Sequence, residues 1–291
     1  MNKHLLVLLG SLFVVSIGFG ITLPVLPFEA ERLAMAGGAS HKTMLVHVGF
    51  LTAVFSLMQL LFAPLWGRLS DRFGRRPLLL LGIAGYALAQ LLFGLATSLL
   101  LLYSARILGG ILASATTPAA TAYVADATSE KERARGMAWL GTAVSMGAVA
   151  GLALGGLTTW QDWHIYSRGG HLLIRSFSLP FFIAAALTVV TLVMAFRWLP
   201  ESTPLGTDRV AHKPVFADWK TVCQKIWPLL SLSIMSQFAL TLFETVFVLH
   251  SQAELGYGAA QIGIAFMVCG VVMATYQDMS LREHNLPLGS V

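Results

Sequence analysis

The sequence predicts an all-α, polytopic membrane protein, and three observations support this class. Of the 291 residues, 56% are hydrophobic and only 11% are charged, and the mean hydropathy is +0.73. A soluble domain carries about 25% charged residues, so this chain has too little polar surface to cover itself in water. The apolar residues also form long continuous runs, whereas a membrane β-barrel shows short alternating segments.

Eight apolar runs are long enough to cross a bilayer as helices. In chain order they are Leu5–Pro27, Leu45–Trp66, Pro77–Leu95, Leu99–Ala125, Gly136–Trp160, Pro180–Leu199, Trp227–His250 and Ala259–Tyr276. The third and fourth runs are nearly continuous, and we expect a tight turn at Gly94 and Thr97-Ser98. The first run has no small-residue cleavage site, so we expect a retained helix and not a signal peptide.

Lysine and arginine are distributed unequally between the two sides of these spans. With the N-terminus inside, the outer loops hold only Arg32, Lys42, Arg168 and Arg175, and the other loops hold most of the remaining basic residues. Because cytoplasmic loops carry the excess of basic residues, we predict a multi-pass protein with its N-terminus inside.

Several classes of function are disfavoured. The basic residues are scattered between apolar runs, which argues against nucleic-acid binding. Cys223 and Cys269 suggest neither a disulfide nor a metal site, and the histidines lack ligand spacing. A Gly-x-x-x-x-Gly-Lys-(Ser/Thr) nucleotide loop does not occur. We therefore expect no metal, no cofactor, no nucleotide partner and no enzymatic activity.

The loop between the second and third spans reads Gly-Arg-Leu-Ser-Asp-Arg-Phe-Gly-Arg-Arg over residues 67–76. It resembles the signature loop of the major facilitator superfamily, Gly-x-Leu-(Ala/Ser)-Asp-Arg-x-Gly-Arg-(Arg/Lys). The simpler interpretation is a basic loop that only follows the charge rule. With the acid Asp126 at the inner end of the fourth span, the resemblance implies a conformational latch made of Gly67, Asp71, Arg72, Gly74, Arg75, Arg76 and Asp126, in which Asp126 meets Arg75.

Arg106 is the only basic residue well inside a span. A lone charge in the membrane costs several kcal/mol unless it is paired or hydrated. Arg106 and the residues up to Gly110 match the Arg-x-x-x-Gly element of the superfamily, which implies a part in proton coupling. The alternative is an arginine that extends to the outer interface, because Arg106 lies early in its helix.

The fifth span carries four glycines, Gly147, Gly151, Gly155 and Gly156. Small residues at four-residue spacing let helices approach closely, and any tightly packed span has this pattern. It also resembles the Gly-x-x-x-Gly-Pro-x-x-Gly-Gly element of drug–proton antiporters, with Leu152 in place of the proline. The end of the first span, Pro24 to Pro27, is similar to the Pro-Val-x-Pro ending of the twelve-helix antiporters. That span lacks the acid of tetracycline exporters, which disfavours tetracycline as the substrate.

Glu244 is the only carboxylate well inside any span. An acid within the membrane is a functional candidate by default, and the alternative is a glutamate hydrated near the outer headgroups. Its context, Phe-Glu-Thr, resembles the seventh helix of quinolone-resistance and multidrug exporters, where the matching glutamate takes part in proton coupling. Further candidates for a cavity that accepts flat apolar drugs are Phe19, Met58, Gln59, Phe62, Met146, Gln237 and Phe238.

The resemblance implies a major facilitator fold of two six-helix bundles, of which this chain supplies eight of an expected twelve helices. The implied domains are an N-terminal six-helix bundle (1–199), a polar central cytoplasmic linker (200–226) and the first two helices of the C-terminal bundle (227–277). Residues 278–291 do not resemble the expected loop, and we interpret them as an anomalous tail produced by a frameshift or an early stop.

The sequence therefore predicts a C-terminally truncated secondary transporter of a bacterial cytoplasmic membrane. Its intact form is expected to export drugs or other amphipathic small molecules in exchange for protons, and the chain of 291 residues is expected not to pump. Two alternatives stay open. One is a facilitator of metabolites or sugars from the same superfamily, and the other is a non-transporting remnant.

Overall fold

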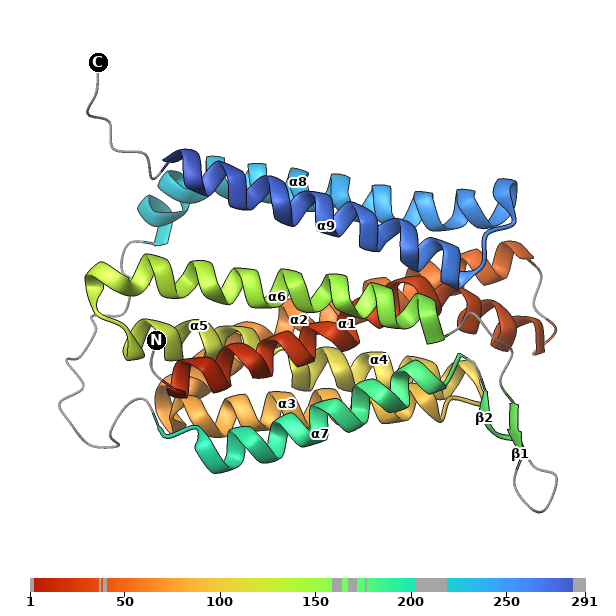
Figure 1. Ribbon diagram of the computed structural model, residues 1–291, viewed down its shortest axis with the longest axis horizontal. Helices are drawn as coiled ribbons and strands as arrows, with labels where there is room; N and C mark the ends of the chain where they lie inside the picture. Colours follow the sequence, from red (N-terminus) through yellow and green to blue (C-terminus); the bar gives the residue numbers. More distant parts are fainter. Residues whose placement is uncertain are drawn as a thin grey trace. The chain divides into compact units, whose positions relative to one another are not determined.

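Helices dominate the computed structural model, which describes residues 3–36, 38, 41–158, 164–166, 172–175, 177–201 and 219–284 (Figure 1). In chain order the elements are α1 (Lys3–Ala36), α2 (His41–Phe73), α3 (Arg75–Gly94), α4 (Leu99–Ala113), α5 (Thr116–Ala127), α6 (Glu130–Thr158), β1 (His164–Tyr166), β2 (Leu172–Arg175), α7 (Leu179–Trp198), α8 (Trp219–Leu255) and α9 (Ala259–His284).

The eight predicted spans are all found as helices, which confirms the all-α class. Within the described residues, seven helices are long and apolar enough to cross a membrane, and Ala259–Val272 is a shorter apolar helix. Some helices run beyond the apolar runs. The first was expected to end at Pro27, but α1 continues to Ala36 with Pro24 and Pro27 inside it. Apolar length marks the part of a helix that lipid surrounds, and it does not mark where the helix ends.

The fourth span consists of two helices, α4 and α5, where one was expected. The helix is interrupted at Ser114 and Ala115, and the Ser114 hydroxyl donates to the Ile111 carbonyl at 2.7 Å. Pro118 explains the interruption, because it has no N–H for the carbonyl four residues earlier, that of Ser114. The turn expected between the third and fourth spans lies between Gly94 and Leu99.

A short antiparallel hairpin lies between α6 and α7. β1 pairs with β2 through Ile165 and Ile174, with an irregularity after Ile165. The predicted linker falls largely outside the described residues at 202–218, and so does the end of the predicted tail at 285–291. The first part of that tail continues α9 as far as His284.

Two compact units make up the chain. The first contains Met1–Thr203 and Ala259–Val291, and the second contains Pro204–Gly258 with α8. The assignment of α8 and α9 to one C-terminal bundle, with residues 200–226 as a linker, stays a prediction.

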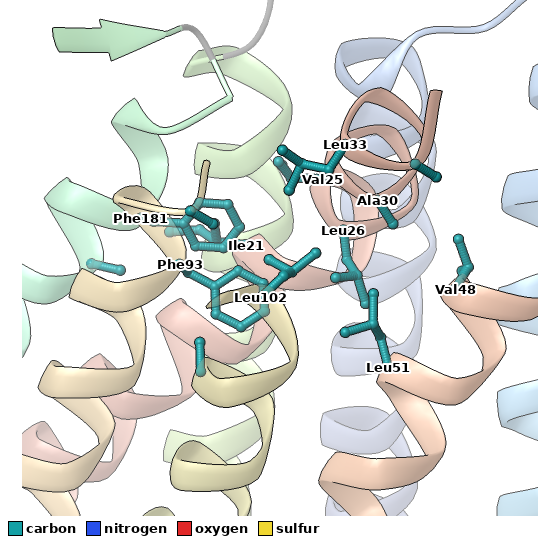
Figure 2. Packing of buried hydrophobic residues seen from close by; sticks show 14 of the residues in the cluster. Ile21, Val25, Leu26, Ala30, Leu33, Val48, Leu51, Phe93, Leu102 and Phe181 are labelled. Atoms are coloured by element: carbon teal, nitrogen blue, oxygen red, sulfur yellow. The ribbon is translucent and has the colours of Figure 1, made fainter. Parts of the chain in front are cut away.

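In the first unit, α1 packs against α2, α6 and α7, and α3 packs against α4 and α7 (Figure 1). Two apolar clusters fill the bundle. One joins side chains of α1, α2, α3, α4 and α7, among them Ile21, Leu51 and the stacked rings of Phe93 and Phe181 (Figure 2). The other joins α1, α3 and α5 around Tyr123. Between them, these clusters hold the helices that carry the charged residues described next.

Candidate functional site

The loop between α2 and α3 is a tight turn that places several charges together; we call this part of the bundle the α2–α3 end. Gly74 links the two helices with a φ of 101°, a left-handed conformation that glycine adopts without strain. The Gly74 N–H donates to the Ser70 carbonyl at 3.1 Å, and Arg75 begins α3 directly afterwards. The chain therefore turns at the single residue Gly74, and Arg75 is the first residue of α3.

Arg75 is the centre of a charged network at the α2–α3 end. Its Nη1 donates to the carboxylate of Asp71, one helical turn earlier, and lies 3.4 Å from the Ser70 hydroxyl. Its Nε donates to Asp126 Oδ2 in α5 at 3.0 Å. The side chain of Arg75 is 16% exposed, against 70% for Asp71 and 31% for Asp126. The contact between Arg75 and Asp126 that the resemblance implied is present.

Glu201, which the sequence analysis did not single out, completes this network. It follows α7, and its Oε1 accepts hydrogen bonds from the backbone N–H groups of Arg75 at 2.7 Å and Arg76 at 3.2 Å. A carboxylate at this position satisfies N–H groups that have no partner inside α3 and stabilises the positive end of the helix dipole. A Cβ at Gly74 would lie 2.6 Å from Glu201 Oε2. Because the glutamate side chain can move, the left-handed conformation is the stronger reason for glycine here.

The segment after α7 is fixed to the same place by further contacts. The Arg76 Nη2 donates to the Phe196 carbonyl at 2.6 Å, and its guanidinium lies over the Phe196 ring. The Tyr123 hydroxyl of α5 donates to the Pro200 carbonyl at 3.1 Å. The α2–α3 end therefore joins α2, α3, α5 and the end of α7 through polar contacts.

Two predicted latch residues lie at the edge of this network. A Cβ at Gly67 would meet nothing within 4 Å, so the structure gives no steric reason for that glycine. The Arg72 guanidinium packs over the ring of the neighbouring Phe73 at 5.4 Å.

Arg106 lies in α4 with different surroundings. It is 7% exposed, so its side chain is covered by the surrounding helices. Its guanidinium lies over the rings of Phe55 in α2 and Phe93 in α3, at 5.1 and 5.0 Å from their centroids. Its Nε is buried and has no hydrogen-bond partner within the described part of the chain. Two aromatic faces thus take the place of the carboxylate that a buried arginine usually has.

The glycines of α6 form a close contact with α1. A Cβ at Gly151 would overlap the Ile17 carbonyl oxygen, and one at Gly147 would overlap the Phe13 carbonyl oxygen. Gly155 faces Ile21 in the same way, with a Cβ that would lie 3.1 Å from its carbonyl oxygen. The backbones of α1 and α6 therefore touch, as the four-residue spacing predicts.

Gly156 lies on another side of α6 and faces α9. A Cβ at Gly156 would lie 3.0 Å from the Ala260 carbonyl oxygen and 3.1 Å from Gly263 Cα. The helix α6 continues without interruption through Leu152, the residue that replaces the proline of the antiporter element. The glycines thus divide between two helix contacts, three toward α1 and one toward α9.

Glu244 lies in α8, in the second unit. The next residue, Thr245, donates its hydroxyl to the Thr241 carbonyl at 2.8 Å, and the rings of Phe243 and Phe247 stack on the same helix. A role for Glu244 in proton coupling stays a prediction.

The predicted drug-cavity residues are spread over several helices. Phe19 of α1 lines a small cavity next to Arg106. The other six are not in the lining of that cavity: Met58, Gln59 and Phe62 of α2, Met146 of α6, and Gln237 and Phe238 of α8. The substrate cavity therefore stays a prediction.

The fold defines the chain as a multi-pass helical membrane protein. A solved bacterial homologue of the human lysosomal transporter Spinster, in an inward-facing and occupied conformation, has a similar fold, with a TM-score of 0.75. The two sequences are 18% identical, and the match covers 97% of this chain and 61% of that one.

A family model described as Major Facilitator Superfamily matches residues 8–280. The chain belongs to this superfamily.

Curated relatives give the same assignment. The chain is 29% identical over 282 residues to multidrug resistance protein 1 of Bacillus subtilis (strain 168) and 30% identical over 285 residues to the class B tetracycline resistance protein of Escherichia coli. Each match covers 95% of this chain and 65% of the relative. The chain thus spans about two thirds of the length of these relatives.

Proposed function

We propose that this chain acts in a secondary transporter that exports drug-like amphipathic molecules in exchange for protons. The observation that carries the proposal is the pairing of a charged α2–α3 end with a glycine contact between α1 and α6, in a chain similar to multidrug and tetracycline resistance proteins. The proposed location is a bacterial cytoplasmic membrane, with the N-terminus and the α2–α3 end on the cytoplasmic side.

The α2–α3 end is proposed to act as a latch. Alternating access requires two arrangements of the helix bundles, and contacts present in only one arrangement set the balance between them. The network of Asp71, Arg75 and Asp126 is proposed to be such a contact. In its support, its members come from α2, α3 and α5, and its outer acid, Asp71, is exposed.

Proton coupling is proposed to use Glu244 and Arg106. The membrane potential supplies about 2.3 kcal/mol per charge per 100 mV, so an acid that loads and unloads a proton across the membrane gains usable energy. Glu244 is the carboxylate that the sequence places well inside an apolar run, and Arg106 is a buried positive charge that can respond to a change of charge nearby.

The test uses a chimera in which residues 1–277 of this chain precede the remaining third of the Bacillus subtilis relative. In everted vesicles, we expect an added drug to release protons through the chimera, and a pH-sensitive dye measures this release. The Glu244→Gln variant is expected to abolish drug-dependent proton exchange while retaining part of the drug binding, because glutamine keeps the shape and cannot titrate.

The matched control is Glu254→Gln, which changes an exposed glutamate of the same helix and is expected to leave exchange unchanged. Undiminished proton exchange in Glu244→Gln would remove Glu244 from the mechanism. A chimera that inserts into the membrane and moves no drug would contradict the proposed function itself.

Residues 1–291 expressed alone are expected not to export. A binding site between two six-helix bundles needs side chains from both, and the described residues supply seven helices long enough to cross a membrane and one shorter apolar helix. The measurement is dye efflux from a drug-sensitive bacterium that lacks its own exporters, after membrane insertion has been verified. Efflux that a protonophore abolishes would contradict this expectation and would indicate an assembly of several chains.

A further inference from the structure

A small cavity lies among α1, α2, α3 and α4, and Arg106 is the charged residue in its lining. The other polar side chains of the lining are Thr22, Tyr86 and Gln90, and the remainder is aromatic or small, including Phe55 and Phe93. The cavity belongs to the first unit alone, and it has room for one species about the size of a water molecule.

Within the part of the chain that the structure describes, no acidic side chain neutralises the positive charge in this cavity. Among the described residues, no Asp or Glu forms an ion pair with Arg106, and its Nε lacks an acceptor. The rings of Phe55 and Phe93 stabilise the cation through their π faces but accept no in-plane hydrogen bond from its N–H groups. The edge of the guanidinium therefore still needs an acceptor, and a negative one would also offset the cost of burial.

Polar side chains next to Arg106 in the cavity lining supply further hydrogen-bond donors. Tyr86 Oη accepts a hydrogen bond from Gln90 Nε2 at 3.2 Å, which leaves the tyrosine O–H free to donate into the cavity. The Thr22 hydroxyl is directed away, since it donates to the Gly18 carbonyl at 3.0 Å. The cavity thus offers donors from Arg106 and Tyr86 together with one full positive charge.

We propose that this cavity binds a small monovalent anion, with chloride as the physiological occupant. Chloride is larger than a water molecule, but it is a single-atom anion that accepts several hydrogen bonds and cancels the charge of Arg106, whereas a water molecule supplies the hydrogen bonds without the charge. The site shares Arg106 with the proposed proton coupling, but its residues come from α1 to α4, so chloride binding can be measured without any transport step.

The experiment measures binding of radioactive chloride to the purified chain of 291 residues in detergent, with gluconate as the replacement anion at constant ionic strength. We expect saturable binding of one chloride per chain, competed by bromide and not by gluconate. We also expect chloride to raise the unfolding temperature, because a ligand that binds only the folded state stabilises it.

Two variants locate the site. Arg106→Gln is expected to lose saturable binding, and Tyr86→Phe, which keeps the ring and the arginine, is expected to weaken affinity by about fivefold through the loss of one hydrogen bond. Arg197→Gln, at an exposed arginine of α7, is the matched control and is expected to bind like wild type. If Arg106→Gln does not fold, the chloride affinity of Tyr86→Phe becomes the test of whether chloride binds in this cavity.

Three results would overturn the proposal. Absence of saturable chloride binding to the wild type would mean that the cavity holds water. Equal binding by wild type, Arg106→Gln and Tyr86→Phe would place the chloride elsewhere. An equal rise in unfolding temperature with chloride and gluconate would indicate a general salt effect.

Discussion

Arg75 and Arg106 carry the same guanidinium in two regions of one helix bundle, and their surroundings are opposite. Arg75 donates to two carboxylates, and its backbone N–H donates to a third. Arg106 is more deeply buried, lies over two phenylalanine rings and has an Nε without an acceptor in the described residues.

The difference shows two ways in which a membrane protein stabilises a charged arginine side chain. At the α2–α3 end, the acids lie close to water, so each ion pair taken singly forms and breaks at low cost, although Arg75 as a whole makes several such contacts. In the cavity, the Arg106 guanidinium is buried and contacts aromatic rings. The free energy of its charged form therefore depends on which molecule or ion occupies the cavity. The first arrangement suits a contact that opens and closes, and the second suits a binding site.

Replacing each arginine by leucine is expected to give the largest difference in stability between the two regions. Arg75→Leu should lower the free energy of unfolding by about 3 kcal/mol, because it leaves Asp126 without this partner and removes several charge-assisted hydrogen bonds. Arg106→Leu, measured in gluconate buffer, should change it by less than about 1 kcal/mol, since an apolar side chain replaces a charge without a carboxylate partner. Thermal unfolding in detergent measures both, and equal losses would contradict the comparison.

A smaller effect is expected when the carboxylate that caps α3 is removed. Glu201→Ala should cost about 1–2 kcal/mol, because two N–H groups at the start of α3 lose their acceptor and the helix dipole loses a negative charge. Glu201→Gln keeps an acceptor and should cost less than the alanine variant. The control is Glu254→Ala at an exposed position of α8, and a loss of equal size there would show that position 201 is not special.

The smallest effect on stability is expected for Asp71→Asn. Its side chain is 70% exposed, so the ion pair with Arg75 should contribute less than about 1 kcal/mol. Drug transport by the chimera should nevertheless fall by about tenfold, because the pair biases two conformations whose balance depends on small energies. Immunoblotting of membranes controls for insertion, and wild-type transport in this variant would remove the latch from the proposal.

Much of the fold was predictable, because apolar length is a direct consequence of the bilayer. The runs located every helix of the described chain that is apolar enough to cross. Helix ends were less predictable, since α1 continues past Pro24 and Pro27, and the fourth span is interrupted four residues before Pro118. Proline removes one hydrogen bond in each case, and packing against neighbouring helices decides whether the helix continues.

The site was predictable where the partners lie in recognisable motifs. The Arg75–Asp126 contact follows from a resemblance between loops, and Asp71 is one helical turn from Arg75. Glu201 was missed because it is a single acid at the start of a polar segment, where charges are usually solvated. The only signal was its position directly after the α7 span. The aromatic faces on Arg106 were also not predictable, since Phe55 and Phe93 lie on other helices.

The contact between α1 and α6 has a consequence for how the protein is made. Gly20 of α1 lies against Gly151 of α6, so the main partner of α1 is made much later in the chain. Another partner, α7, is translated later still. During synthesis, the glycine face of α1 therefore contacts lipid or other proteins until α6 has been made. The bundle closes only after translation has passed Trp198. A bulky residue at Gly20 would first reduce the yield of newly made protein, before any effect on transport could be measured.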